Sequence, residues 1–104
     1  MVVVISNAPE ADAPRIAQTL VKERRAACVN LLAPVRSIYT WKGELCDDAE
    51  IPLLIKVADA GVSALVERLS ELHPYDVPEI VVLPVDVARS HPGYVAWVRE
   101  HSGG

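Results

Sequence analysis

Hydrophobic and polar positions alternate along the chain in blocks that predict a definite order of strands and helices. The run Val2–Ser6 is rich in β-branched residues, which is typical of a strand buried on both faces. Residues 13–21 then carry apolar side chains at helical spacing, which predicts one amphipathic helix. Asp12 is the expected N-cap, and Pro14 falls in the first turn, where its missing N–H costs no hydrogen bond.

Residues 26–57 predict a long β-hairpin that turns at residues 41–43. Pro34 interrupts the first arm, so a bulge or a switch in pairing is expected there. Both arms exceed the typical strand length of about 5–6 residues. The hairpin is therefore expected to project beyond its own sheet, and its exposed edges favour pairing with another chain.

The two cysteines lie on this hairpin, one on each arm. If the hairpin is centred on Lys42, Cys28 lies near Lys56 and Cys46 lies near Ile38. This separation excludes a disulfide between them. Neither thiol stands in a setting that favours a reactive thiolate.

The second half of the chain repeats the helix-and-strand order. A helix is expected to begin after Asp59 or Ser63 and to end at residues 73–74, and a buried strand follows at residues 80–83. Ser90 is expected to cap a short final helix. We therefore predict an α+β fold of the ferredoxin-like βαββαβ kind, with a four-stranded antiparallel core sheet, a long extended hairpin and an additional C-terminal helix. Residues 1–104 are expected to form a single domain.

Charge and composition narrow the functions that this fold can serve. The formal net charge is -4, and nucleic-acid binding would need a basic face that the sequence lacks. No apolar run approaches the roughly 20 residues of a membrane span, and the N-terminal run is too short for a signal peptide. We therefore expect a cytoplasmic protein that binds neither nucleic acid nor membrane.

Signatures of catalysis are also missing from the sequence. It contains no CxxC pair, no Gly-rich phosphate loop and no nucleophile placed beside a base in a known pattern. We therefore predict that the protein is not an enzyme and carries no organic cofactor.

The segment 73–79 is the densest in functional side chains, and it contains two prolines that restrict its shape. It presents an imidazole, a phenol and carboxylates, from His73, Tyr75, Asp76 and Glu79. These groups predict a ligand or metal site. The structural alternative is that His73 caps the preceding helix, Tyr75 packs and Glu79 bonds strand-end amides.

Further candidates lie on the hairpin. Tyr39 and Trp41 flank its tip and favour packing against a neighbouring subunit over ligand stacking. Lys56 ends an apolar run, where it either extends its ammonium group to solvent or meets an anion. An acidic run favours a solvated strand face over a site for a hard cation, and it consists of Glu44, Asp47, Asp48 and Glu50.

Three segments together resemble the CutA family of divalent-cation-tolerance proteins: RRAACVNLLAPVRSIYTWKGEL, LLIKV and LHPYDVPEIVVLPV. The resemblance implies a ferredoxin-like subunit in a tight homotrimer whose strands extend into neighbouring subunits. It also implies an association with copper and other divalent metals, and an architecture similar to the PII-type signalling trimers.

The resemblance also implies where a metal would bind. Copper ligands proposed in the family are a cysteine after the first strand and histidines closing the second helix. Here those positions hold Ser6, Leu72 and His73, so only His73 matches, and Glu79 is the expected second donor. The expected cofactor is Cu(II) or another divalent cation.

Two main functions are compatible with this picture. The first is a trimeric copper-binding protein that contributes to divalent cation tolerance. The alternative is a PII-like regulatory trimer that binds a small anionic ligand in an inter-subunit cleft, with Lys56, Tyr39, Trp41, Tyr75 and Glu79 as the expected contacts. A third possibility is a trimer that serves only as a platform for partner proteins.

Overall fold

The computed structural model describes residues 1–103 and confirms the predicted order of elements. Two short 3-10 turns precede α2 and α3, at Asp59–Gly61 and Val87–Arg89. The main elements are β1 (Val2–Ala8), α1 (Ala13–Lys22), β2 (Cys28–Leu31), β3 (Val35–Trp41), β4 (Glu44–Val57), α2 (Val62–Leu72), β5 (Ile80–Pro84) and α3 (Pro92–His101). The α+β ferredoxin-like fold is thus confirmed. None of the helices described is long and apolar enough to cross a membrane.

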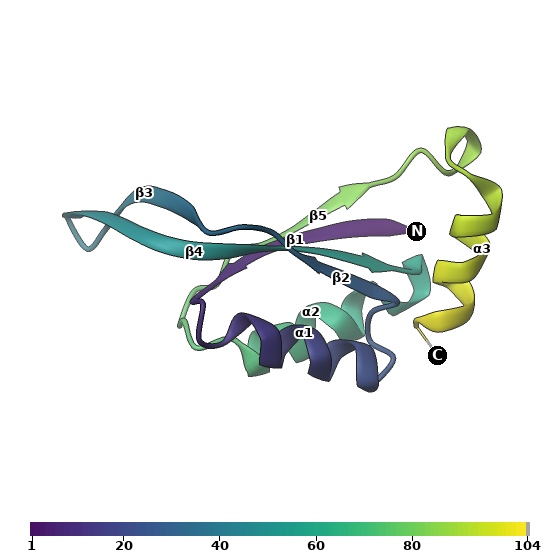
Figure 1. The fold of residues 1–104 in the computed structure, drawn as a ribbon, viewed down its shortest axis with the longest axis horizontal. Helices are drawn as coiled ribbons and strands as arrows, with labels where there is room; N and C mark the ends of the chain where they lie inside the picture. The colour runs from purple at the N-terminus through teal and green to yellow at the C-terminus, as the bar shows by residue number, and fades with distance from the viewer. Residues whose placement is uncertain (104) are drawn as a thin grey trace.

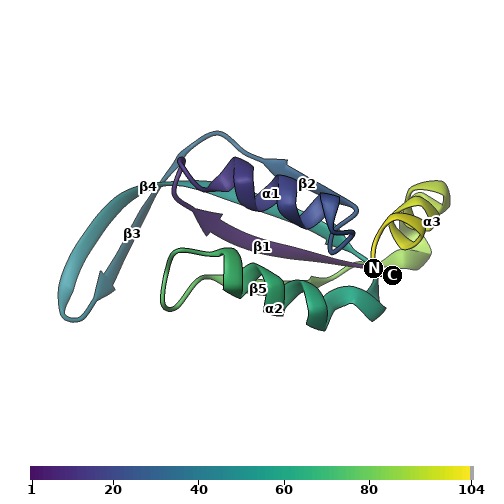
Figure 2. The ribbon, with the colours of Figure 1, turned by 90° about the horizontal axis from the view of Figure 1, so that it is seen from below.

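The core sheet is antiparallel, with strand order β2-β4-β1-β5, and β3 pairs only with β4. Helices α1 and α2 lie against one face of this sheet (Figures 1 and 2). The core between the two layers consists of fully buried aliphatic side chains, among them Ile16 and Leu20 of α1, Leu65 of α2, and Leu53 and Ile55 of β4. Helix α3 lies at the end of the sheet, near the N-terminus (Figure 1).

The first arm of the hairpin is divided at Pro34 into the two strands β2 and β3. This division is expected because proline has no amide hydrogen to donate to a neighbouring strand. Strands β2 and β3 both pair with β4, and the pairing slips by one residue between them. Cys28 therefore lies opposite Lys56, as predicted, whereas Cys46 lies opposite Tyr39 and not Ile38. The tip is a tight turn in which Lys42 and Gly43 have φ of 50° and 81°, as a two-residue hairpin turn requires.

The β3–β4 hairpin projects well beyond the body of the molecule (Figure 1). The Cα radius of gyration is 14.2 Å and the longest extent is 45 Å. A compact domain of this length has a radius of gyration of about 13 Å. The chain is therefore more extended than its length requires, as the length of the hairpin arms predicts.

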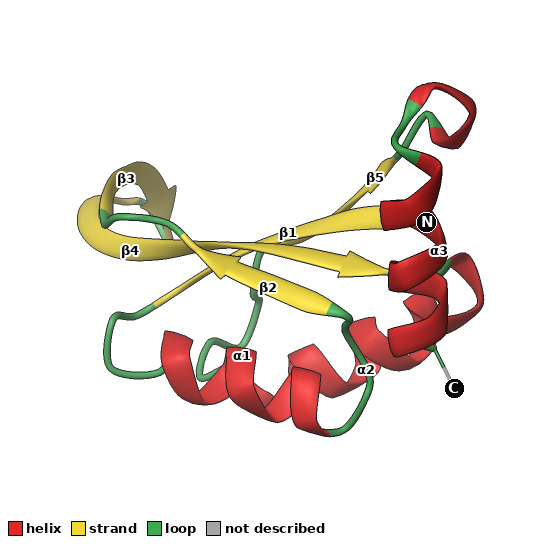
Figure 3. Cartoon of the chain, turned by 45° about the vertical axis from the view of Figure 1, so that its right-hand side comes forward, coloured by secondary structure: helices red, strands yellow, loops and turns green. Residues whose placement is uncertain are grey.

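The predictions that the first strand is buried on both faces and that the last strand is buried are wrong for the single chain. In β1, burial alternates, so Val4 is fully buried against the helices while Val3 is only half-buried. In β5, the side chains of Val81, Val82 and Leu83 are 45%, 42% and 41% exposed. No helix of residues 1–103 covers the second face of the sheet (Figure 3), which accounts for Val81 and Leu83. Val82 shares the side of Val4, and it is exposed on β5, the edge strand of the sheet.

Two predicted caps also differ from the structure. Asp12 occupies the N-cap position of α1, but its carboxylate accepts a hydrogen bond from Arg15 instead of capping an amide. His91, and not Ser90, is the N-cap of α3, and its Nδ1 accepts a hydrogen bond from the amide of Tyr94. Ser90 instead donates its hydroxyl proton to the carbonyl of Asp86.

Ser6 is the one described residue whose buried side-chain oxygen has no hydrogen-bond partner. Its side chain is fully buried on the face of β1 that the helices cover. A buried hydroxyl that makes no hydrogen bond loses its interaction with water without compensation.

We expect Ser6→Ala to raise the free energy of unfolding by about 1 kcal/mol, because it removes an unsatisfied polar group at almost constant volume. Chemical denaturation at fixed protein concentration measures this change. The matched control is Ser70→Ala, whose exposed hydroxyl only bonds the carbonyl of Val66 in its own helix. A lower stability of Ser6→Ala than of the parent would show that the hydroxyl has a stabilising partner after all.

Candidate ligand pocket at the base of the hairpin

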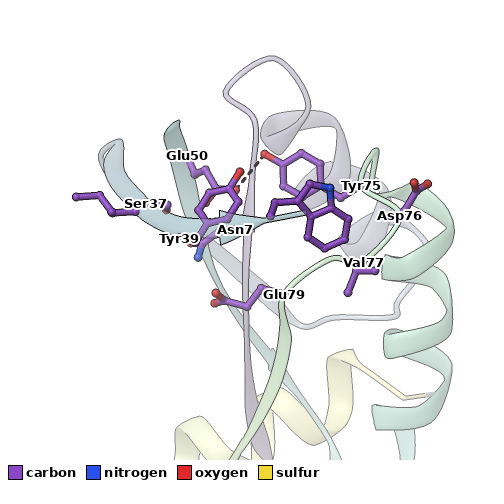
Figure 4. Close-up of a pocket in the computed structure, with 10 residues that line it drawn as sticks. Asn7, Ser37, Tyr39, Glu50, Tyr75, Asp76, Val77 and Glu79 are labelled. Carbon is purple, nitrogen blue, oxygen red and sulfur yellow. Dashed lines mark hydrogen bonds between the residues drawn. The ribbon is translucent and has the colours of Figure 1, made fainter. Parts of the chain in front are cut away.

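A pocket of about 550 Å³ lies where the hairpin, the end of β1 and the loop 73–79 meet (Figure 4). Its walls are mainly aromatic and acidic. Of the side chains predicted to form a site, those of Tyr39, Trp41, Tyr75, Asp76 and Glu79 line it. Glu50, Asn7, Ser37, Ile38 and Val77 complete the lining.

The side chains that the hairpin contributes to the pocket wall follow from the alternation of side chains along β3. Ser37, Tyr39 and Trp41 are every second residue of β3, so they share one face of the strand. Glu50 lies opposite Val35 at the start of β3. The sequence of β3 therefore presents two aromatic rings beside a carboxylate.

His73 fastens the loop to the sheet. Its side chain is 6% exposed, and its Nε2 donates to the carbonyl oxygen of Asn7 at 2.7 Å. Its Nδ1 accepts a hydrogen bond from the amide of Tyr75 at 3.2 Å. Because Nδ1 is the acceptor, the ring is the neutral tautomer that carries its proton on Nε2. Both ring nitrogens are therefore occupied by bonds to the backbone.

Tyr75 connects the loop to the hairpin. Its hydroxyl donates to Oε2 of Glu50 at 3.0 Å, the bond that the dashed line in Figure 4 marks. Glu50 is only 7% exposed. Burial, together with the adjacent Glu50 carboxylate, raises the pKa of Tyr75 to about 12. The hydroxyl of Tyr39 donates in the same way to Asp48, and this bond raises the pKa of Tyr39.

The structure separates Lys56 from the other residues predicted for the cleft. Lys56 lies toward the far end of β4, opposite Cys28 and Val3, and its ammonium group donates to the side chain of Asn30. Within one chain it does not reach the pocket. Its meeting with Trp41 and Tyr75 across a subunit boundary stays a prediction about the assembled trimer.

Glu50 is the pocket residue whose part the sequence analysis missed. It was assigned to a solvated acidic run, but it is buried and bonded to Tyr75. Two other residues of that run have separate partners, since Asp47 pairs with Arg36 and Asp48 with Tyr39. The hairpin register gave the available signal, because it places Glu50 of β4 opposite the start of β3, where the projecting hairpin meets the body of the fold.

The residues predicted as metal ligands do not fit a copper ion within one chain. Both nitrogens of His73 are bonded, and Glu79, the expected second donor, lines the pocket. Ser6, which stands where the family's proposed cysteine ligand would be, lies buried on the helix side of β1. Residues 1–103 also contain no group of three or more His, Cys, Asp or Glu side chains placed to hold one metal ion. Copper prefers imidazole and thiolate ligands, and neither is free at this position.

An α+β chain with one uncovered sheet face and a projecting hairpin has the ferredoxin-like architecture of PII-like CutA proteins. Residues 1–101 match the family described as CutA1 divalent ion tolerance protein. The chain belongs to this family.

Known relatives support both the family and the fold. The chain is 46% identical over 102 residues to the divalent-cation tolerance protein CutA of Thermus thermophilus, covering 98% of this chain and 97% of that protein. It superposes with a TM-score of 0.94 on the PII-like protein CutA from Nostoc sp. PCC 7120 in apo form, at 45% identity, covering 98% and 97% of the two chains. CutA1 from Pyrococcus horikoshii gives a TM-score of 0.90 at 36% identity, with 98% of each chain covered.

The tyrosines provide a direct test of the negative charge around the pocket. The pKa values of Tyr39, Tyr75 and Tyr94, the three tyrosines of the chain, are all raised. We therefore expect the folded protein to show little phenolate absorbance near pH 10, the ordinary pKa of tyrosine. Tyr75→Phe should remove a step near pH 12, whereas Tyr94→Phe should leave that step in place.

Because the folded state holds the Tyr75 proton more tightly than the unfolded chain, its contribution to stability is complete below about pH 10 and is lost as the pH rises through about 12. The urea-unfolded protein serves as the reference, in which all three tyrosines should titrate together. A full one-tyrosine step near pH 10 in the folded protein that disappears in Tyr75→Phe would contradict this account.

Proposed function

We propose that this protein is a cytoplasmic, homotrimeric binding protein of the PII-like type that serves divalent cation tolerance without catalysing a reaction. The observation that carries the proposal is the pocket at the base of the hairpin, in a chain of the CutA1 family. Its volume of about 550 Å³ lies within the range of small-molecule sites, roughly 300–1,000 Å³.

The uncovered face of the sheet supports the trimer. Val3 and Ile5 of β1 point to this face. Their cross-strand partners are the apolar residues Leu83, Val81 and Leu54, together with Lys56 opposite Val3. Contiguous apolar surface of this kind marks an interface in soluble proteins. The outer edge of β5 carries no partner strand in residues 1–103, so it too favours pairing with a second chain.

The contacts of the pocket support binding in place of catalysis. The imidazole beside it, His73, uses both nitrogens to hold the backbone. The hydroxyls of Tyr39 and Tyr75 donate to carboxylates and, with raised pKa values, keep their protons at neutral pH. These groups shape a cavity and are not free to act on a substrate.

Copper or another divalent cation is the second candidate ligand, favoured by the names of the relatives and by the presence of His73 and Glu79 in one loop. Binding through His73 would first require breaking its bond to Asn7 or to the Tyr75 amide. A tight copper site would therefore need a rearranged loop or donors from another subunit.

Calorimetric titration of Cu(II), and then Zn(II), into chelator-stripped protein tests this second function, with the mass checked by light scattering. We expect His73→Ala to bind these ions as the parent does, because neither imidazole nitrogen is free. His101→Ala is the matched control on α3. Micromolar or tighter binding that is lost in His73→Ala and kept in His101→Ala would establish His73 as a ligand, and the loop geometry described above would then be the metal-free arrangement only.

A further inference from the structure

Glu50 is a buried carboxylate that faces the pocket without a cation. It is 7% exposed, and its hydrogen-bond partner is the neutral hydroxyl of Tyr75. Within one chain, no lysine or arginine of residues 1–103 pairs with it or lines the pocket, and the guanidinium group of Arg36 on β3 is bound to Asp47. A carboxylate removed from water is normally stabilised by a positive partner.

The other charged groups of the pocket have the same sign. Asp76 and Glu79 line its exposed rim. The hydroxyl protons of Tyr39 and Tyr75 are both used on carboxylates, so neither is available to an anion. Within one chain, the pocket therefore presents a negative potential that favours a cation over an anion.

Aromatic side chains form the remainder of the wall. Tyr39, Trp41 and Tyr75 all line the cavity, and the face of an aromatic ring attracts cations through its quadrupole. Trp41 already shows this preference within the chain, because the ammonium group of Lys42 lies 5.9 Å from its ring centroid. Rings beside a buried carboxylate are the arrangement that recognises organic ammonium groups.

The size of the pocket separates an organic cation from a metal ion. A volume of about 550 Å³ exceeds what one metal ion fills, and no set of three metal-binding side chains surrounds it in residues 1–103. The rings of the lining offer contact to an apolar body. An ammonium or guanidinium group carried on such a body satisfies both the rings and the carboxylate.

We propose that the pocket binds a small organic cation, with its ammonium or guanidinium group against Glu50 and its apolar body against Tyr39, Trp41 and Tyr75. This inference rests on the proposed function, since it assigns the chemical class of ligand to the pocket of the binding protein. The negative rim at Asp76 and Glu79 steers the cation toward the cavity.

Three probes with similar bodies and different charges test the proposal by calorimetry on the assembled protein: phenethylammonium, phenethyl alcohol and 3-phenylpropionate. We expect phenethylammonium to bind about tenfold more tightly than the alcohol, and 3-phenylpropionate to bind least. Added salt should weaken the binding of the cation.

Glu50→Gln removes the charge at nearly constant shape and should reduce phenethylammonium affinity about tenfold. Glu67→Gln, on an exposed position of α2, is the matched control and should bind like the parent. Trp41→Leu, on the exposed hairpin, is a second variant that should weaken the same binding if Glu50→Gln fails to fold.

The outcomes separate this inference from the proposed function. Tighter binding of the alcohol or of 3-phenylpropionate overturns the cation proposal and leaves a ligand-binding protein. Equal affinity of Glu50→Gln and the parent also overturns it. If none of the three probes binds and the protein is shown to be trimeric, the proposal of an organic-cation site is overturned. This result would indicate that a group of a neighbouring subunit fills the pocket. A monomeric protein refutes the proposed function independently of any probe.

Discussion

The constraint on which the rest of the structure depends is that two helices can cover only one face of the sheet. Helices α1 and α2 bury the side of β1 and β4 that carries Val4 and Ile55. The other side is left uncovered, and it is mainly apolar apart from Lys56. The hydrophobic effect opposes leaving such a surface in water. The long hairpin and the open edge of β5 become reasonable if another copy of the chain completes the core.

The pocket depends on a second, local constraint, which is the attachment of the loop 73–79 to two different strands. His73 joins it to the end of β1 through the Asn7 carbonyl, and Tyr75 joins it to β4 through Glu50. These bonds connect residues 66 and 25 positions apart in the chain. They turn a short proline-containing loop into one wall of a cavity, and they use the imidazole that would otherwise serve as a metal ligand.

Periodicity predicted the order of the elements and the hairpin register to within one residue, because both depend on local spacing and on the missing amide of Pro34. It did not predict that β1 is covered on one side only, or that Val81, Val82 and Leu83 of β5 are all exposed. An uninterrupted apolar run has the same composition whether a helix or a neighbouring chain covers it. Likewise, the loop side chains of the pocket were predicted as candidates, but the burial of Glu50 and the distance of Lys56 follow from contacts distant in sequence.

The most direct test of the central claim is the solution mass of the chain, measured by light scattering on the parent and on Val81→Asp, with Ala88→Asp as an exposed control outside the sheet. The account predicts a parent mass of three chains of 11.3 kDa each. It also predicts that a buried aspartate on β5 breaks this assembly, while the control keeps it. A parent protein with the mass of a single chain, folded and soluble with its second sheet face open to water, would contradict the account.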